Sequence, residues 1–167
     1  MAVAGASVAF SAASPSAKLQ KQDRLWGGGQ VAAGTCSITD PDFCIGPARN
    51  LSVDAHAEGD GSGAVGNSAQ NVQTPRTVTC LSVDGNKAAI GGVIGSTGDL
   101  YLQYFVDRGT TLPTDERDLT SAVYVGTNPW PAGFPDVCPP AAGADALPPV
   151  YLVMGGGDIV VQDAPSD

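Results

Sequence analysis

The sequence is poor in residues that favour helices. Lysine occurs only as Lys18, Lys21 and Lys87, and glutamate only as Glu58 and Glu116, whereas 22 of the 167 residues are glycine and 13 are proline. Glycine and proline disfavour helix interiors, while lysine and glutamate usually populate exposed helix faces. The composition therefore excludes a helical bundle and predicts strands joined by turns, in a chain short enough for one domain.

Positive charge and long apolar runs are also scarce. Lysine and arginine together number 8 against 17 acids, which gives a net charge of −9. Proteins that bind nucleic acid place basic side chains against phosphates, so nucleic acid is not an expected partner. No segment approaches the roughly 20 apolar residues of a transmembrane helix, so the chain is not expected to be membrane-spanning.

The four cysteines lack the paired CxxC spacing of zinc sites, and the single histidine, His56, is remote from them in sequence. Disulfides are the better interpretation. Of the three connectivities we favour Cys36 with Cys44, which closes a short loop, and Cys80 with Cys138, which ties a central hairpin to a proline-rich loop. Disulfides persist outside the cytosol, so the chain is expected to be secreted or to lie at the cell surface.

The first 25 residues differ in composition from the rest. Residues 2–13 are small and apolar, residues 14–17 (SPSA) resemble a signal-peptide cleavage region, and a polar connector follows. We therefore expect residues 1–25 to be a flexible N-terminal arm or a signal-peptide remnant. Residues 26–164 are expected to form a single β-domain, and residues 165–167 a tail.

Residues 77–94 predict a β-hairpin. Two runs rich in β-branched residues flank Asp84-Gly85-Asn86. Asp-Gly tolerates the positive φ angles that a short hairpin turn needs, so the two runs are expected to pair as antiparallel strands.

The remaining pattern extends this prediction to the whole domain. Further strands are expected at 27–33, 50–57, 64–70, 99–107, 120–126, 149–154 and 158–162, whereas residues 127–149 contain seven prolines and are not expected to be sheet. About eight antiparallel strands predict an all-β fold, an up-and-down barrel, with a two-sheet β-sandwich as the alternative. Glycine triplets at 27–29 and 155–157 favour the barrel, because glycine suits sharp bends and close backbone approaches.

Several short pieces, in order, resemble a group of small secreted bacterial proteins common in actinobacteria. They are WGGG at 26–29, VTCLSVDGN at 78–86, IGGVI at 90–94, FVDRG at 105–109 and GGDIVV at 156–161. That group has a glycine-rich opening, a VTC-L-x-V-x-G-N hairpin followed by IGG, a V-x-D-N-G segment and a closing GGNIQVHD-like strand. This chain has Arg108 and Gln162 where the group usually has Asn and His. The resemblance implies a secreted all-β domain and carries no reaction, ligand or catalytic residue.

Asp54 and His56 are candidates for chemistry because they lie two apart on an expected strand and so share a face. A nearby serine would complete a hydrolase-like group. No Gly-x-Ser-x-Gly elbow occurs, so we expect a polar outer face instead of an active site, and the protein is not expected to be an enzyme.

A second candidate is a metal loop. Glu58, Asp60 and Ser62 alternate before a glycine, as at the start of a calcium loop. Position twelve of that loop is Ala69 rather than the Glu that would complete the ligation, which favours a simple hairpin turn. No cofactor is expected.

These observations leave two functional hypotheses. The first is a non-catalytic β-domain with a structural or interaction role at the cell surface, with an unknown protein partner or self-assembly through the N-terminal arm. The alternative is an extracellular carrier of a small apolar ligand inside the barrel, with a cavity lined by residues such as Leu102, Tyr104, Tyr124 and Leu152.

Overall fold

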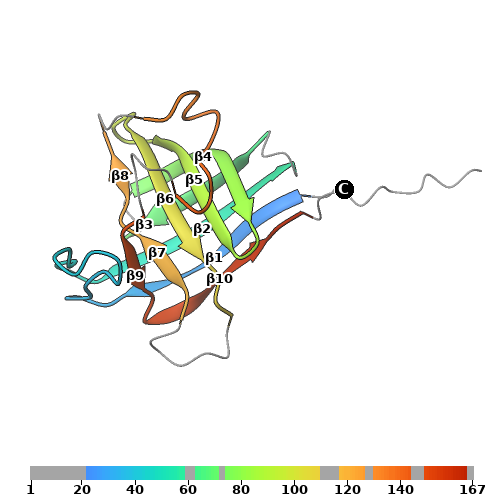
Figure 1. Cartoon of the computed structure of the whole chain (residues 1–167). Coiled ribbons are helices and arrows are strands. Elements are labelled where there is room, and N and C mark those ends of the chain that lie inside the picture. Colours follow the sequence, from blue (N-terminus) through green and yellow to red (C-terminus); the bar gives the residue numbers. More distant parts are fainter. Residues whose placement is uncertain are drawn as a thin grey trace, which may run out of the picture.

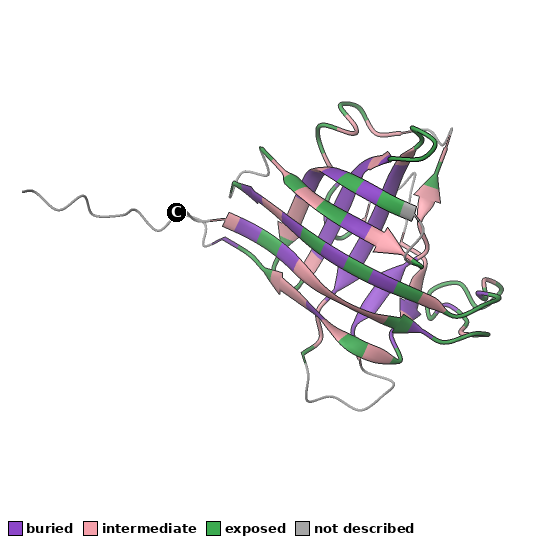
Figure 2. Cartoon of the chain, turned by 180° about the vertical axis from the view of Figure 1, so that it is seen from behind, coloured by how far each residue is buried: buried purple, intermediate pink, exposed green. Residues whose placement is uncertain are grey.

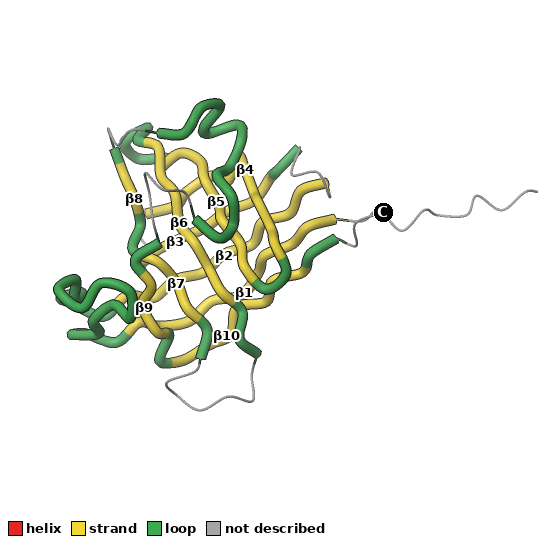
Figure 3. Tube along the Cα trace, viewed as in Figure 1, coloured by secondary structure: helices red, strands yellow, loops and turns green. Residues whose placement is uncertain are grey.

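The computed structural model describes residues 22–58, 63–71, 74–109, 117–126, 130–143 and 149–164. Within these ranges the secondary structure is entirely β (Figure 3). The strands are β1 Gln22–Val31, β2 Arg49–Glu58, β3 Val65–Gln70, β4 Thr74–Asp84, β5 Lys87–Ile94, β6 Leu100–Val106, β7 Leu119–Ser121, β8 Tyr124–Val125, β9 Tyr151–Val153 and β10 Gly156–Gln162. In these ranges no helix is long and apolar enough to cross a membrane.

All ten strands belong to one antiparallel sheet, in the order β10-β1-β2-β3-β4-β5-β6-β7-β9, with β8 paired to β6. The sheet curls on itself, as Figure 1 shows. Its two end strands, β9 and β10, are consecutive in the chain and are joined through Met154 and Gly155. The predicted barrel-like all-β fold is therefore confirmed, with more strands than the eight expected.

Alternating side chains explain why β2 forms and which way it faces. Leu51, Val53, Ala55 and Ala57 are buried, while the residues between them are exposed or half-buried. Side chains in a strand point to opposite faces in turn, so this period of two places one row in the core and the other in solvent. The same striping runs along the back of the barrel in Figure 2.

β5 and β6 are buried on both faces. Their inner side chains, such as Ile90 and Phe105, join the main core. Their outer side chains form a second cluster with the partly buried aromatics of the later chain, namely Ala89, Leu102 and Tyr104 with Tyr124, Trp130, Phe134 and Tyr151. The proline-rich segment thus covers one side of the barrel, and its described residues contain no strand between 126 and 150, as predicted.

The hairpin predicted at 77–94 is β4 and β5. Asp84 pairs with Lys87, so Gly85 and Asn86 form the turn, and Gly85 has a φ of 58°. A β-bulge interrupts the register between Val78 and Cys80. Bulges increase local twist and bend a strand, which suits a sheet that must curl.

The two glycine triplets lie on the paired strands β1 and β10 and meet at one pair, Gly29 with Gly157. Gly27 pairs with Ile159, Gly28 with Asp158 and Gly29 with Gly157. A Cβ at Gly157 would lie 2.0 Å from the carbonyl oxygen of Gly28. The strands therefore approach too closely for any side chain there, which is the role expected of these glycines.

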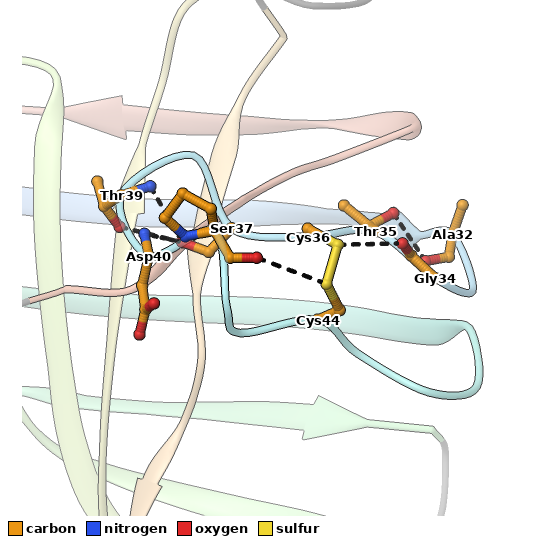
Figure 4. The surroundings of a disulfide bond; sticks show 9 residues. Ala32, Gly34, Thr35, Cys36, Ser37, Thr39, Asp40 and Cys44 are labelled. Carbon is orange, nitrogen blue, oxygen red and sulfur yellow. Dashed lines mark hydrogen bonds between the residues drawn. A yellow bond between two sulfur atoms is a disulfide. The ribbon is translucent and has the colours of Figure 1, made fainter.

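The disulfides pair Cys36 with Cys44 and Cys80 with Cys138, the connectivity favoured from the sequence. Figure 4 shows the first, inside a loop where the Ser37 hydroxyl accepts hydrogen bonds from the backbone N–H groups of Thr39 and Asp40. The second joins β4 to the proline-rich segment. Two disulfides fit an oxidising, extracellular environment.

Two boundaries differ from the sequence expectation. β1 begins at Gln22 rather than near residue 26, because Leu25 is fully buried and the Asp23 carboxylate accepts a hydrogen bond from the Ala164 N–H group. The strand expected at 120–126 is split into β7 and β8, because its register with β6 shifts by one residue: Phe105 pairs with Thr120, but Leu102 pairs with Tyr124.

Candidate functional site

The barrel interior contains a polar layer centred on Arg76 of β4. Arg76 is only 5% exposed and shares the inward face with Val78, two residues further along the strand. Ser68 of β3 and Tyr101 and Gln103 of β6 are also buried around it. Most other interior side chains form a continuous apolar cluster.

Hydrogen bonds connect the polar layer. Arg76 donates from Nη2 to Gln70 Oε1 at 2.9 Å and from Nη1 to Gln103 Oε1 at 3.4 Å. Gln103 in turn donates to the Thr120 hydroxyl at 2.8 Å. The Arg76 guanidinium also lies over the Tyr101 ring, 5.3 Å from its centroid, which is a cation–π geometry.

Burial makes the charged form of Arg76 less favourable than it would be in water. Burial lowers the pKa of its guanidinium, the Tyr101 hydroxyl opposes that shift, and the positive charge of Arg49 adds to it. The pKa of Tyr101 is raised by burial, an effect that its hydrogen bond with Ser68 and the proximity of Arg76 partly offset. Among the described residues, no carboxylate contributes to the environment of Arg76.

In Figure 2, no other described segment of the chain covers the outer surface formed by β10, β1, β2 and β3. We call it the open face and define it by its outward side chains, Val160, Arg24, Trp26, Asp54, His56, Val65 and Asn67. The register aligns them in two rows: Arg24 lies beside His56, which lies beside Val65, and Trp26 lies beside Asp54, which lies beside Asn67. The Arg24 guanidinium stacks 5.2 Å from the Trp26 ring.

Asp54 and His56 are therefore outward neighbours on one strand, as predicted. Asp54 is exposed and His56 half-buried. Their nearest cross-strand partners are Trp26, Arg24, Asn67 and Val65, none of which is a nucleophile.

The candidate calcium loop lies largely outside the described residues. Glu58 is the exposed last residue of β2, and Asp60 and Ser62 fall in the range that the structure does not describe. In the described ranges no group of three His, Cys, Asp or Glu side chains gathers in a way that could hold a metal ion.

The four residues proposed to line a ligand cavity divide between two clusters. Leu152 belongs to the main core inside the barrel. Leu102, Tyr104 and Tyr124 belong to the second cluster, beneath the proline-rich segment on the outer side of β5 and β6. Burial raises the pKa of the Tyr124 hydroxyl.

Carboxylates bridge the seam where β10 meets the ends of β6 and β7. Asp118 accepts from the Arg108 N–H group with Oδ1 at 2.8 Å and from the Ile159 N–H group with Oδ2 at 2.7 Å. Asp107 likewise accepts from the Gly109 and Val161 N–H groups. These side chains supply the acceptors that a neighbouring strand would otherwise provide for β10.

Sequence reasoning missed Arg76, although a signal was present. Arg76 alternates in phase with Val78 in the predicted strand, so it points to the same side as an apolar residue. A single charge in such a row is usually exposed, and only the structure places it in the core.

Fold and geometry together define an antiparallel β-barrel protein with an open outer face and a polar interior layer. Comparison with known proteins adds no family: no family model, no curated protein and no solved structure matches the chain.

Proposed function

We propose that this protein is a non-catalytic, secreted β-barrel domain with a structural or interaction role at the cell surface, and that it associates with a second copy of itself. The observation that carries this proposal is the open face. Its centre holds a stacked Trp26 and Arg24, two residue types that are enriched at the energetic centres of protein interfaces.

Charge favours a second copy as the occupant of this face. The chain carries a net charge of −9, which opposes self-association over most of its surface. The two adjacent rows of the open face instead carry one charge of each sign, Arg24 and Asp54. In a contact with two-fold symmetry, Arg24 of each copy can lie against Asp54 of the other copy.

The N-terminal arm is the second element of this proposal. It joins β1 at Gln22, next to the open face, and the small apolar residues at 2–13 suit strand addition to a neighbouring copy. The deletion that tests it should remove residues 1–21, because removing residues up to 25 would also delete the buried Leu25.

Light scattering of the full chain, the 1–21 deletion and a Trp26→Ser variant tests this function. We expect the full chain to form a defined oligomer and both changes to reduce its mass. Arg117→Ser is the control, since its side chain lies beyond the open face and binds the Gly155 carbonyl. A full chain that stays monomeric at every concentration, or variants that keep the oligomer, would refute the proposal.

The second candidate function is a carrier of a small ligand inside the barrel. Leu152, one of the residues proposed to line the ligand, lies in the interior core. The interior also contains the polar layer around Arg76, which favours a ligand with a polar end rather than a purely apolar one.

A further inference from the structure

Among the residues that the structure describes, Arg76 is a buried cation without a counter-ion. The chain has 17 acids and 8 basic residues, yet the described residues place no carboxylate against this guanidinium. Its acceptors are two neutral amide oxygens, on Gln70 and Gln103. A buried charge is normally paired, because hydrogen bonds to neutral groups leave much of its desolvation cost uncompensated.

The Arg76 guanidinium has more N–H donors than the acceptors described around it. Arginine carries five N–H donors, and the side chains around Arg76 accept from two of them. Its Nε atom is buried and has no hydrogen-bond partner in the described part of the chain. A carboxylate matches this need, because it can accept two parallel N–H bonds from one guanidinium.

The two amide acceptors differ in how firmly they are held. Gln103 is 3% exposed and is fixed by its own hydrogen bond to Thr120. Gln70 is half-buried at the end of β3, and its side-chain oxygen accepts the hydrogen bond from Arg76 Nη2. Gln70 is thus the acceptor that a ligand can replace, and it marks the side from which the ligand reaches Arg76.

We propose that Arg76 anchors an interior site for a small molecule with one carboxylate and an apolar body. The carboxylate takes the place of the Gln70 oxygen at Nη2 and also accepts from Nε. The apolar body lies against Tyr101, Val78 and Ile94, which surround Arg76 on its own and neighbouring strands. A single carboxylate fits better than a phosphate dianion, because one buried guanidinium supplies one positive charge.

This proposal deepens the carrier candidate and is independent of the open face. The test uses the full, disulfide-bonded chain with octanoate, octanol and inorganic phosphate at equal ionic strength, read by thermal unfolding and calorimetry. Octanoate is expected to bind and raise the melting temperature, whereas octanol and phosphate have little effect.

Two variants, each with a matched control, make the test specific. Arg76→Gln should weaken octanoate affinity by about tenfold or more, since it removes the charge-assisted hydrogen bonds. Arg24→Gln, which removes an exposed arginine on the open face, should leave the affinity unchanged. Gln70→Glu places a carboxylate 2.9 Å from Nη2, so it should raise the melting temperature and abolish the octanoate effect. Gln30→Glu adds the same charge at an exposed position and controls for net charge.

The possible outcomes distinguish the carrier function, the recognition of a carboxylate and the class of ligand. Equal binding of octanol and octanoate would keep the carrier and overturn carboxylate recognition. Equal binding of phosphate would overturn the ligand class. If no probe binds and Gln70→Glu lowers the melting temperature, Arg76 is already satisfied by its amide partners, and both the site and the carrier candidate are overturned. None of these results depends on self-association.

Discussion

At the residue scale, facing glycines let β1 and β10 approach. Gly157 has a φ of 89°, and any side chain there would collide with the backbone of Gly28 and Gly29. Its neighbour Gly156 has open space around the position of a Cβ. These two adjacent glycines therefore allow a matched test of the close pairing of β1 with β10.

Gly157→Ala is expected to destabilise the protein by about 2 to 4 kcal/mol, because it adds positive-φ strain and forces the strands apart. Gly156→Ala should change the free energy of unfolding by less than about 0.5 kcal/mol. Urea unfolding measures both. Similar costs for the two variants would contradict the close approach of β1 and β10.

Asp158 lies at the seam and is held in a disfavoured charged state. Burial raises the pKa of its carboxyl, and the charges of Asp118 and Asp107 and a hydrogen bond with Asp118 raise it further. A raised folded-state pKa means that the native protein binds the proton more readily than the unfolded chain. This carboxyl therefore favours folding below its unfolded pKa and loses that contribution as pH rises through its folded pKa.

Asp158→Asn should consequently stabilise the protein at neutral pH, by a few tenths of a kcal/mol, since the group is partly solvated. The gain should fade as pH falls below the range in which carboxyls titrate. Thermal unfolding of both proteins from pH 3 to pH 8 measures it. A gain that grows toward acid pH would contradict the raised pKa.

Individual residues differ in how far the sequence indicated their roles. The structure has the cysteine pairing favoured among three possible connectivities, and Gly29 and Gly157 approach closely, as backbone chemistry predicts for glycine. The role of Arg76 could not be predicted from the sequence. Alternation places Arg76 on the inner face of β4, but its burial depends on Tyr101 and Gln103, which belong to a strand that begins 24 residues later. The acceptor roles of Asp107 and Asp118 were hidden for the same reason, since they depend on which strand ends meet.

At the element scale, the seam is the unusual feature of the sheet. β7 and β9 are only three residues long, and neither of them pairs with β10. The carboxylates of Asp107 and Asp118 cover the remaining N–H groups of β10. Short β7 and β9 follow from the prolines and polar loops around them. β2 could be predicted from its clear alternation, and β5 and β6 from their β-branched and aromatic residues, although both of these strands are buried on both faces.

Asp118→Asn should cost about 1 to 3 kcal/mol, because the amide offers only one acceptor and presents N–H donors toward the N–H groups of Arg108 and Ile159. The effect is opposite in sign to that of Asp158→Asn, although both remove one negative charge from the seam. Asp99→Asn, in the exposed β5–β6 turn, is the control. Unfolding by urea gives the three values, and a neutral Asp118→Asn would contradict the bridging role.

At the scale of the whole molecule, the two disulfides constrain very different lengths of chain. Cys36 and Cys44 are 8 residues apart, whereas Cys80 and Cys138 are 58 apart. In the chain-entropy model these closures contribute about 2.5 and about 4 kcal/mol. The disulfide between Cys80 and Cys138 also holds Phe134 against Gly91. A Cβ added at Gly91 would lie 2.3 Å from the Phe134 ring.

Replacing Cys80 and Cys138 by alanine should therefore destabilise the protein more than replacing Cys36 and Cys44. The difference should be at least about 1.5 kcal/mol, to which lost packing of the proline-rich segment adds. Urea unfolding of the two double variants measures the order. A larger cost for the short loop would contradict this account of what stabilises the covered side.

The central claim is that the open face, and not the covered side, is where the molecule meets a second copy. The chain has 2 tryptophans, and they report on the two sides: Trp26 lies on the open face, while Trp130 stacks on Phe134 in the covering segment. Hydroxyl-radical oxidation of each tryptophan, quantified by mass spectrometry from dilute to concentrated protein, tests the claim most directly. Oxidation of Trp26 should fall as the oligomer forms, while that of Trp130 stays constant. Constant oxidation of Trp26, or protection of Trp130 instead, would contradict the claim.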